Sequence, residues 1–389
     1  MRPNRPIYLD HHATTPLDPR VLAAMRPWWE DNFANPHRAE HAMGRAAEAA
    51  VEAARVHVAA LIAADPREII FTSGATEANN LAIKGAARFA GHAGPRRVIT
   101  LASEHKCVLE SVRDLAAEGF EPVVLPVGAD GLLDLDVLAD ALRIPTLLVS
   151  VMSVNNEIGV VQDLAAIGAM VKAAGAAFHT DAAQAAGRIS LDVNDIQADL
   201  VSLTAHKIYG PKGVGALYVR RRPRMRLAPL FSGGGQERGL RSGTLPAPLL
   251  VGFGEAARIA AAEMVLDQGR IAGQRSRFLA ALDIPGIIVN GHAERRVVGN
   301  LNISFPGGVG AEALLAAAPD LCASTGSACS SASIEPSTVL AALGIPEAQA
   351  RATLRLGFGR FTSPAEADLA AAWLQAAWRQ VVARSQAAE

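Results

Sequence analysis

The sequence predicts an α/β fold with a mostly parallel sheet, followed by a smaller α+β region. Short runs of β-branched and apolar residues alternate with alanine-rich segments of helix length, as in chains built from βα units. This alternation ends after Arg220, and beyond about residue 260 helices mix with isolated strands. The chain has 389 residues, enough for two domains. We expect a large domain over 16–259 and a small domain made of 1–15 and 260–389.

The individual elements follow in order along the chain. Apolar residues at three- and four-residue spacing predict helices over 41–63 and 164–175, which would cover the sheet. A basic segment rich in glycine and proline, residues 220–248, predicts a loop before a long helix. Strands are expected in the small domain at 301–305 and 352–358. The large sheet is expected to have seven strands, at 68–72, 97–102, 122–127, 146–152, 176–181, 199–204 and 215–220.

Composition limits the classes of partner. Hydrophobic residues make up 50% of the chain and charged residues 19%, so it should fold into a globule. The 37 basic and 38 acidic residues give a net charge of −1, which argues against nucleic acid or an anionic membrane as the main partner. The start does not resemble a secretory signal, and charged residues interrupt the most apolar stretch, 249–265. We therefore expect a cytoplasmic protein with a small-molecule substrate.

The three cysteines, Cys107, Cys322 and Cys329, are too few and too scattered for a disulfide framework or a structural zinc site. Any special cysteine should therefore be a reactive one. Cys329 lies among small, turn-forming residues, which are typical of an exposed loop. Cys322 is expected in a buried strand, and Cys107 in the buried first turn of a helix.

Polar side chains follow four predicted strands, at the edge where parallel sheets bind their ligands. The segment 72–76 leaves a strand and enters a helix, so its free N–H groups could hold a phosphate. The polar residues after the other three strands are His105, Asp181 with Gln184, and Thr204 with His206 and Lys207.

Each of these residues alone has an ordinary interpretation. The aspartate could cap a helix, the histidine could be a satisfied core residue, and the lysine could point to water. Together, an anion cradle, a carboxylate, an imidazole and an amine predict a site for pyridoxal 5'-phosphate, which needs a Schiff-base lysine and a carboxylate for its pyridine nitrogen. Lys207 is preferred to Lys212 because it lies nearer the end of its strand, whereas Lys212 sits in a turn.

Longer motifs make the pattern specific. They are "YLDHHATTP", "FTSGATEANNLAIKGAA", "SVNNEIGVVQDL", "FHTDAAQAAG", "HKIYGPKGVGALYVRR", "GGGQERGLRSGT" and "STGSACSSASIEPSTVL". Over residues 7 to 365 the chain resembles the cysteine desulfurases of the iron–sulfur cluster assembly type. The resemblance implies an aspartate-aminotransferase-like fold (fold type I), a homodimer, and conversion of L-cysteine to L-alanine with sulfur kept as a persulfide. It also implies an iron–sulfur scaffold protein and other sulfur acceptors as partners.

The resemblance assigns roles to residues of the matching motifs. Lys207 would form the Schiff base, Asp181 would contact the pyridine nitrogen, and His105 would lie against the ring and move protons. Cys329 would take up the sulfur and serve at most as a transient iron–sulfur ligand; no stable metal is expected. The remaining assignments are Gln184 to the ring hydroxyl, Ala75, Thr76, Thr204 and His206 to the phosphate, Thr244 to the phosphate of the partner subunit, Asn156 to both cofactor and substrate, and Arg355 to the substrate.

The sequence also departs from the family pattern. Thr204 stands where serine is common, but its hydroxyl should still reach the phosphate. His11 and His12 invite a metal interpretation, which we disfavour because no third ligand is placed. The chain ends soon after its last helix, whereas relatives often continue into a tail that helps to dock the scaffold, so transfer to a scaffold is less secure than persulfide formation.

Other functions stay open at this stage. A selenocysteine lyase or a small-amino-acid aminotransferase could use the same lysine, aspartate and phosphate cup, although aminotransfer needs no thiol at Cys329. "GFGEAA", residues 252–257, weakly suggests a dinucleotide-binding module but falls inside a predicted helix. A non-catalytic sulfur carrier or assembly subunit would not need the intact lysine, histidine and cysteine.

Overall fold

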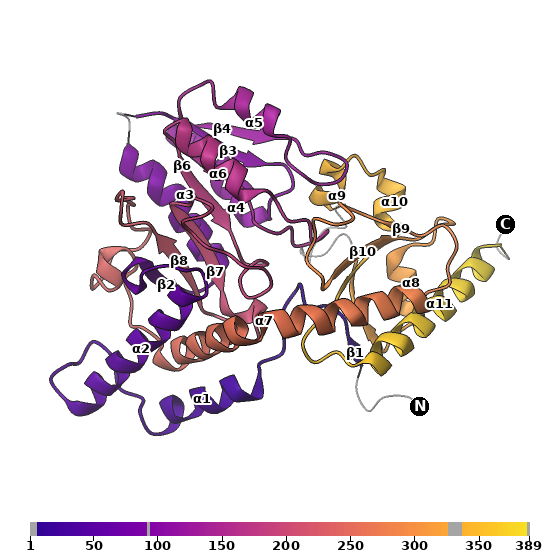
Figure 1. Ribbon diagram of the computed structural model, residues 1–389, viewed down its shortest axis with the longest axis horizontal. Coiled ribbons are helices and arrows are strands. Elements are labelled where there is room, and N and C mark those ends of the chain that lie inside the picture. Colours follow the sequence, from indigo (N-terminus) through magenta and orange to yellow (C-terminus); the bar gives the residue numbers. More distant parts are fainter. Residues whose placement is uncertain (1–5, 92–93, 326–336, 387–389) are drawn as a thin grey trace.

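The computed structural model describes residues 6–91, 94–325 and 337–386 (Figure 1). Its largest sheet has seven strands in the order β2-β8-β7-β6-β5-β3-β4, and within it only β8 runs antiparallel to its neighbours. The mostly parallel seven-stranded sheet is therefore confirmed. The strands are β2 (Ile69–Thr72), β3 (Arg97–Leu101), β4 (Glu121–Leu125), β5 (Thr146–Ser150), β6 (Ala177–Asp181), β7 (Leu200–Thr204) and β8 (Gly215–Val219).

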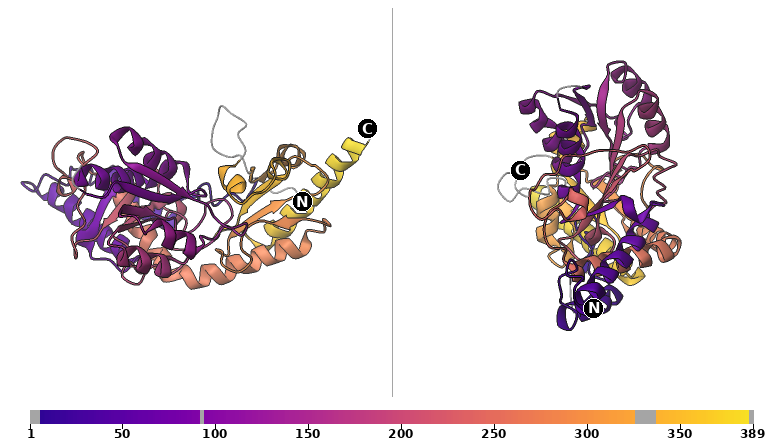
Figure 2. Two further views of the ribbon diagram at one scale, coloured as in Figure 1. Left: turned by 90° about the horizontal axis from the view of Figure 1, so that it is seen from above. Right: turned by 90° about the vertical axis from the view of Figure 1, so that its left-hand side faces the viewer.

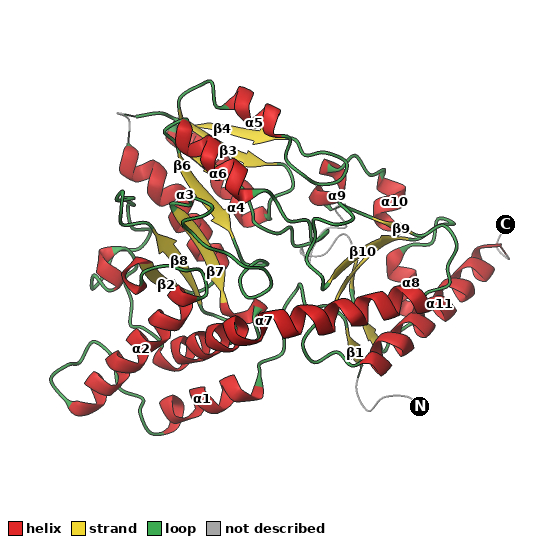
Figure 3. Ribbon diagram, viewed as in Figure 1, coloured by secondary structure: helices red, strands yellow, loops and turns green. Residues whose placement is uncertain are grey.

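Helices cover both faces of this sheet (Figure 3). Alternate strand residues, such as Ile70, Leu148 and Leu200, pack on one face against helices α3 and α4. The opposite face, with Phe71 and Phe178 among its residues, packs against α1, α2, α6 and the first half of α7. The bounds are α1 (Pro19–Glu30), α2 (Ala42–Ala60), α3 (Ala75–Ala90), α4 (Lys106–Asp114), α5 (Leu135–Ala141), α6 (Leu164–Ala173) and α7 (Ala247–Ala281).

A second, smaller core lies at the other end of α7. It gathers Phe278 of α7, the strands β10 and β13, and the helices α8 and α11. Ile7 and Leu9, at the start of the chain, are buried in the same core. The elements here are β1 (Ile7–Tyr8), β9 (Ile288–Val289), β10 (Asn300–Ser304), α8 (Ala311–Ala317), β11 (Leu321–Cys322), β12 (Ser324–Thr325), α9 (Thr338–Ala342), α10 (Glu347–Arg351), β13 (Thr353–Gly357) and α11 (Pro364–Gln386).

Helix α7 connects the two cores. It is one helix of 35 residues that runs along both halves of the molecule, and the views of Figure 2 agree on this course. The expected boundary at residue 259 falls inside this helix, so no break in the backbone marks it, and the division into two domains stays a prediction. No helix among the described residues combines the length and apolarity that crossing a membrane requires.

Two small sheets, one antiparallel and one parallel, lie around the second core. β13 pairs with β10 on one side and with β12 on the other, while β9 extends the sheet beyond β10. β1 pairs in parallel with β11, so that Ile7 lies beside Leu321. The expected strands at 301–305 and 352–358 are confirmed within one residue as β10 and β13, whereas the shorter edge strands gave no signal of their own.

Candidate active site

A cleft of about 570 Å³ opens where the carboxyl ends of β5, β6 and β7 meet the start of α3 and the strand β13. Carboxyl ends of parallel strands share one edge of a sheet, which explains why side chains distant in sequence converge here. The cleft brings together ten of the predicted site residues: Ala75, Thr76, His105, Asn156, Asp181, Gln184, Thr204, His206, Lys207 and Arg355.

Lys207 ends the short 3₁₀ turn Ala205–Lys207, which follows β7 directly. Its amine donates to the carbonyl oxygens of His12 and Ala13, the latter at 2.7 Å. Burial, together with the positive charges of Arg188 and Arg355, lowers the pKa of Lys207 to about 7. The amine is therefore partly neutral near pH 7, which is the form that attacks a carbonyl group or accepts a proton. Lys212, by contrast, is exposed, as its place in a turn predicted.

Asp181 is the last residue of β6 and is buried. Its Oδ1 accepts the amide of Ala183 at 2.9 Å, and its Oδ2 accepts the side-chain amide of Asn79 at 2.7 Å. Gln184, also buried, donates to the carbonyl oxygen of His12 at 2.9 Å. Both side chains are thus fixed by hydrogen bonds at the floor of the cleft.

The start of α3 offers an anion site. Gly74 precedes the helix with a φ of 153°, a conformation that favours glycine, and no side chain caps the first turn within the described residues. Thr204 Oγ1 would lie 4.0 Å from a Cβ added at Gly74, so its hydroxyl stands beside these free amides. Burial and the charges of Lys207 and Lys212 lower the pKa of His206 to about 4, so this histidine is neutral near pH 7.

His105 begins α4 as its N-cap, because Nδ1 accepts the amide of Cys107 at 3.2 Å. Burial lowers the pKa of His105, with the Asp181 carboxylate opposing and the Lys207 and Lys106 cations adding to the shift. Cys107 lies in the first turn of α4, as expected, but is half-buried rather than fully buried. Cys322 lies in the strand β11 and is likewise half-buried.

Arg355 reaches the cleft from β13 in the second sheet. Its guanidinium donates to Asp10 Oδ1 at 2.8 Å, to Ser324 Oγ at 2.9 Å and to the carbonyl oxygen of Asn156 at 3.1 Å. This pair is not a surface salt bridge, because the arginine and aspartate side chains are only 8% and 16% exposed. Arg355 Nε and Asn156 Oδ1 are buried without a partner among the described residues, which suits them to a bound ligand.

Two predicted residues do not join this cleft. Cys329 lies outside the described residues, so its position is not characterised. Thr244 is exposed in the loop between β8 and α7 and does not line the cleft. Its assignment to a partner subunit stays a prediction.

Sequence reasoning missed several residues of the site, most of all at the start of the chain. His12 accepts a hydrogen bond from Arg188 at 2.8 Å, and His11 Nδ1 contacts the carbonyl oxygen of Gly357 at 2.8 Å, so both histidines have partners within the protein. Within the described ranges, no group of three potential ligands could hold a metal ion. Asp10 and Ser324 were also missed, because no local pattern links them to Arg355. Asn79 did leave a signal, as a polar residue on the apolar face of a helix.

Comparison with known proteins places the chain in a family. The model of aminotransferase class V matches residues 7–369. "Cysteine desulfurase, mitochondrial" of Arthroderma benhamiae is 55% identical over 94% of this chain and 73% of that protein. "Cysteine desulfurase IscS" of Rickettsia felis is 53% identical over 95% of this chain and 90% of that protein.

A solved structure gives the same result for the fold. A NifS-like protein superposes with a TM-score of 0.89 at 33% identity, covering 96% of this chain and all of that one. The predicted fold type and the predicted resemblance are therefore both confirmed. The chain belongs to the aminotransferase class-V family, alongside proteins that carry the name cysteine desulfurase.

Proposed function

We propose that this protein is a pyridoxal-phosphate-dependent cysteine desulfurase, which converts L-cysteine to L-alanine and keeps the sulfur as a persulfide on Cys329. The carrying observation is the cleft itself. A lysine of lowered pKa lies there between an uncapped helix start and an arginine with an unpaired nitrogen. The names of the relatives at 53–55% identity support the same activity.

The residues present fit pyridoxal phosphate. The free amides of α3, with Thr204 and His206, suit the phosphate, because a helix start favours bound anions. Asp181 suits the pyridine nitrogen, since its carboxylate is held on both oxygens and so has a fixed orientation. Lys207 suits the aldehyde, because its amine is partly neutral near pH 7. When bound, the cofactor supplies an electron sink for the pair released as the substrate's Cα–H bond breaks.

The protein's own groups carry the other steps of the proposed mechanism. Arg355 and Asn156 hold the substrate carboxylate and so orient its Cα–H bond, with Arg355 Nε as the free donor. Lys207, with a pKa near 7, accepts the Cα proton as a general base.

The Cys329 thiolate then attacks the substrate's sulfur and forms an S–S bond. The C–S bond breaks with its electron pair left on the three-carbon fragment, which takes up one proton at Cβ and regains one at Cα to become alanine. His105 lies at the cleft to supply the Cβ proton, and Lys207 returns the proton that it took from Cα.

The finer parts of the proposal concern partners and location. A homodimer would let the exposed Thr244 reach the phosphate site of the second copy. The resemblance to the iron–sulfur assembly type supports delivery of the persulfide sulfur to a scaffold protein and other acceptors, with Cys329 as a transient cluster ligand. We place the protein in the cytoplasm, and its near-neutral charge argues against nucleic acid as a partner.

The decisive experiment counts products. Purified protein loaded with pyridoxal phosphate is incubated with L-cysteine and a reductant, and alanine and sulfide are measured. We expect equal amounts of both from the unaltered protein and from Cys322→Ala, the matched control for removing a thiol. Cys329→Ala should release neither product at a comparable rate, while it still binds the cofactor. Lys207→Ala should lose activity by about 10²–10⁴-fold and lose the cofactor's covalent attachment.

Other outcomes point to the alternative functions. Alanine from L-cysteine at full rate in Cys329→Ala would contradict the assigned nucleophile. A requirement for a keto-acid acceptor would favour an aminotransferase, and turnover of selenocysteine alone would favour a selenocysteine lyase. No product from any amino acid, with the cofactor bound, would favour a non-catalytic carrier.

A further inference from the structure

His105 belongs to a cluster of four hydrogen-bonded side chains. Asn79 comes from α3, His105 and Cys107 from the start of α4, and Asp181 from the end of β6. The side-chain amide of Asn79 donates to Asp181 Oδ2 at 2.7 Å and to Cys107 Sγ at 3.1 Å. Cys107 Sγ in turn lies 3.0 Å from His105 Nδ1. We call these four residues the His105 cluster.

The direction of each hydrogen bond in the His105 cluster follows from chemistry. The backbone amide of Cys107 can only donate, so His105 Nδ1, at 3.2 Å, must carry a lone pair. The Cys107 thiol, 3.0 Å away, donates to the same nitrogen and shares its lone pair with the amide, while Thr76 also lies within hydrogen-bond reach of the sulfur. The Cys107 sulfur accepts from Asn79, whose amide nitrogen has to face the Asp181 carboxylate. Burial, assisted by the Asp181 charge, raises the pKa of the thiol to about 12, so it keeps the proton that it donates.

The orientation of Asn79 is costly, which indicates that the arrangement is a specific one. Asn79 is fully buried, and its Oδ1 has no hydrogen-bond partner among the described residues. An unpaired buried acceptor has given up its hydrogen bonds to water without replacement, which destabilises the fold. In this orientation Oδ1 is left unpaired, but the amide nitrogen of Asn79 holds both Asp181 and the Cys107 sulfur.

We propose that Cys107 and Asn79 are positioning residues that keep His105 neutral, with its proton on Nε2, the nitrogen on the cleft side of the ring. This inference rests on the proposed desulfurase function. His105 lines the cleft, where part of its ring is open, while Nδ1 is covered by the start of α4. His105 therefore meets the reacting groups as a proton donor, which leaves the role of base to Lys207.

The charges around His105 act on the same equilibrium. The Asp181 carboxylate favours the imidazolium form, whereas burial and the Lys207 and Lys106 cations disfavour it. A proton on Nδ1 would also point at two donors, the amide and the thiol of Cys107. Substitution of Asp181, Lys207 or Lys106 would change the charge near His105, and a backbone amide cannot be substituted. The Cys107 thiol can be replaced without changing the charge, so it is the group to test.

The test compares two substitutions that separate hydrogen bonding from packing. Cys107→Val is nearly isosteric but has no donor, whereas Cys107→Ser is smaller and keeps one. If the hydrogen bond matters, Val raises the pKa of His105 by roughly half to one unit and lets a signal for a proton on Nδ1 appear, while Ser stays near the unaltered protein. If only volume matters, Ser shifts the pKa more than Val. Cys322→Val is the matched control.

The readout is the nitrogen spectrum of ring-¹⁵N-histidine-labelled protein, as purified with its cofactor, titrated with pH. His105→Asn assigns the signal, and the chemical shifts report which ring nitrogen carries the proton. In parallel, Cys107→Val should lower kcat for alanine formation with little change in KM, because a proton donor is misplaced while the substrate site is intact.

Two results would overturn the proposal: a proton on Nδ1 of His105 in the unaltered protein, or equal His105 titration in the Val, Ser and control variants. Because the spectrum needs no turnover, it judges the His105 cluster even if L-cysteine gives no alanine. The absence of alanine would refute the proposed function and would leave the proposal on His105 standing.

Discussion

The two walls of the cleft are built on different cores, and they are fixed in different ways. Asp181 and Thr204 end the neighbouring strands β6 and β7, and Lys207 lies in the turn directly after Thr204, so backbone hydrogen bonds of one sheet set their spacing. Arg355 belongs to the second sheet and is held by Asp10 and Ser324. The first wall therefore depends on a single sheet, whereas the second depends on how the two cores are joined.

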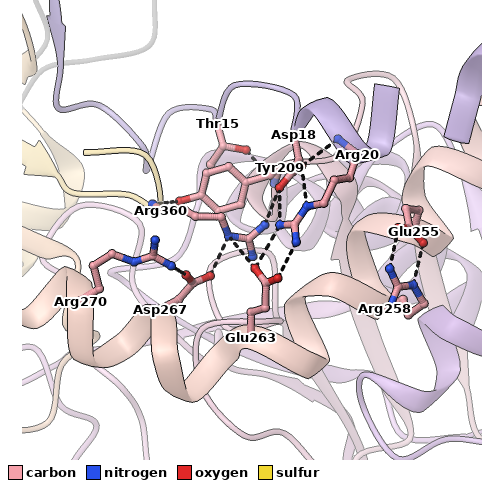
Figure 4. A network of polar contacts seen from close by, with 10 residues as sticks. All are labelled: Thr15, Asp18, Arg20, Tyr209, Glu255, Arg258, Glu263, Asp267, Arg270 and Arg360. Carbon is pink, nitrogen blue, oxygen red and sulfur yellow. Dashed lines mark hydrogen bonds and ion pairs between the residues drawn. The ribbon is translucent and has the colours of Figure 1, made fainter. Parts of the chain in front are cut away.

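The junction between the walls contains a buried ion-pair network, drawn in Figure 4. Arg360 follows β13 and pairs with Asp18 at 2.9 Å and with Asp267 of α7 at 2.8 Å. Its guanidinium also lies 4.5 Å from the ring centroid of Tyr209, two residues beyond Lys207. Burial opposes the ionised form of Asp18, but hydrogen bonds from Arg20 and Arg360 outweigh it and lower the pKa of Asp18 to about 2. The network thus joins the wall of the cleft that carries Lys207 (the lysine wall) to the wall that carries Arg355 (the arginine wall).

The largest effect should come from breaking this junction. Arg360→Met removes the buried partner that Asp18 and Asp267 share, and leaves Asp18 with Arg20 and Asp267 with Arg270. The loss of these charged hydrogen bonds should cost about 1.5–3 kcal/mol in the free energy of unfolding. Urea titration measures this. The control is Arg258→Met, which breaks the half-exposed pair with Glu255 and should cost less than about 1 kcal/mol. Equal losses in the two variants would show that the junction contributes no more than a surface pair.

A second substitution tests the arginine wall alone. Arg355→Lys keeps the positive charge but loses the planar set of donors, so KM for L-cysteine should rise by about 10–100-fold with a smaller change in kcat. Steady-state kinetics measures both constants, and Arg351→Lys, in an exposed pair with Glu347, serves as the control. A fall in kcat without a change in KM would contradict a role in holding the substrate.

The smallest effect concerns the lysine wall. Arg188 is half-buried, its described hydrogen-bond partners are uncharged, and it donates to the carbonyl oxygen of Lys207 at 3.3 Å. Since its charge helps to lower the pKa of Lys207, Arg188→Met should raise that pKa above about 7. The neutral fraction of the amine at pH 7 then falls, by at most about tenfold for one unit.

The pH dependence of pyridoxal phosphate uptake by the cofactor-free protein measures this shift. Uptake should rise with pH around 7 in the unaltered protein and at higher pH in Arg188→Met, while Arg188→Lys keeps the original midpoint. Identical profiles in all three would exclude an electrostatic effect of Arg188.

The same contrast explains what the sequence could predict. Lys207, Asp181 and His105 each follow a run of β-branched residues, so a local pattern located both the strand and the side chain at its end. Arg355 was identified only through its motif, and Asp10 not at all, because their pairing joins residues far apart in the chain. The direction of β8 was also not predictable, since an antiparallel strand has the same alternation of residues as its parallel neighbours.

The pairing of β1 with β11 has a consequence for how the protein is made. The carbonyl groups of His12 and Ala13, which hold the Lys207 amine, lie a few residues beyond β1, and the strand that pairs with β1 among the described residues is Leu321–Cys322. At roughly 5–20 residues per second, a ribosome delivers that strand on the order of a quarter of a minute to a minute after the start of the chain. The large sheet can therefore fold early, while the lysine acquires its full surroundings only when synthesis is nearly complete, so a growing chain stays inactive.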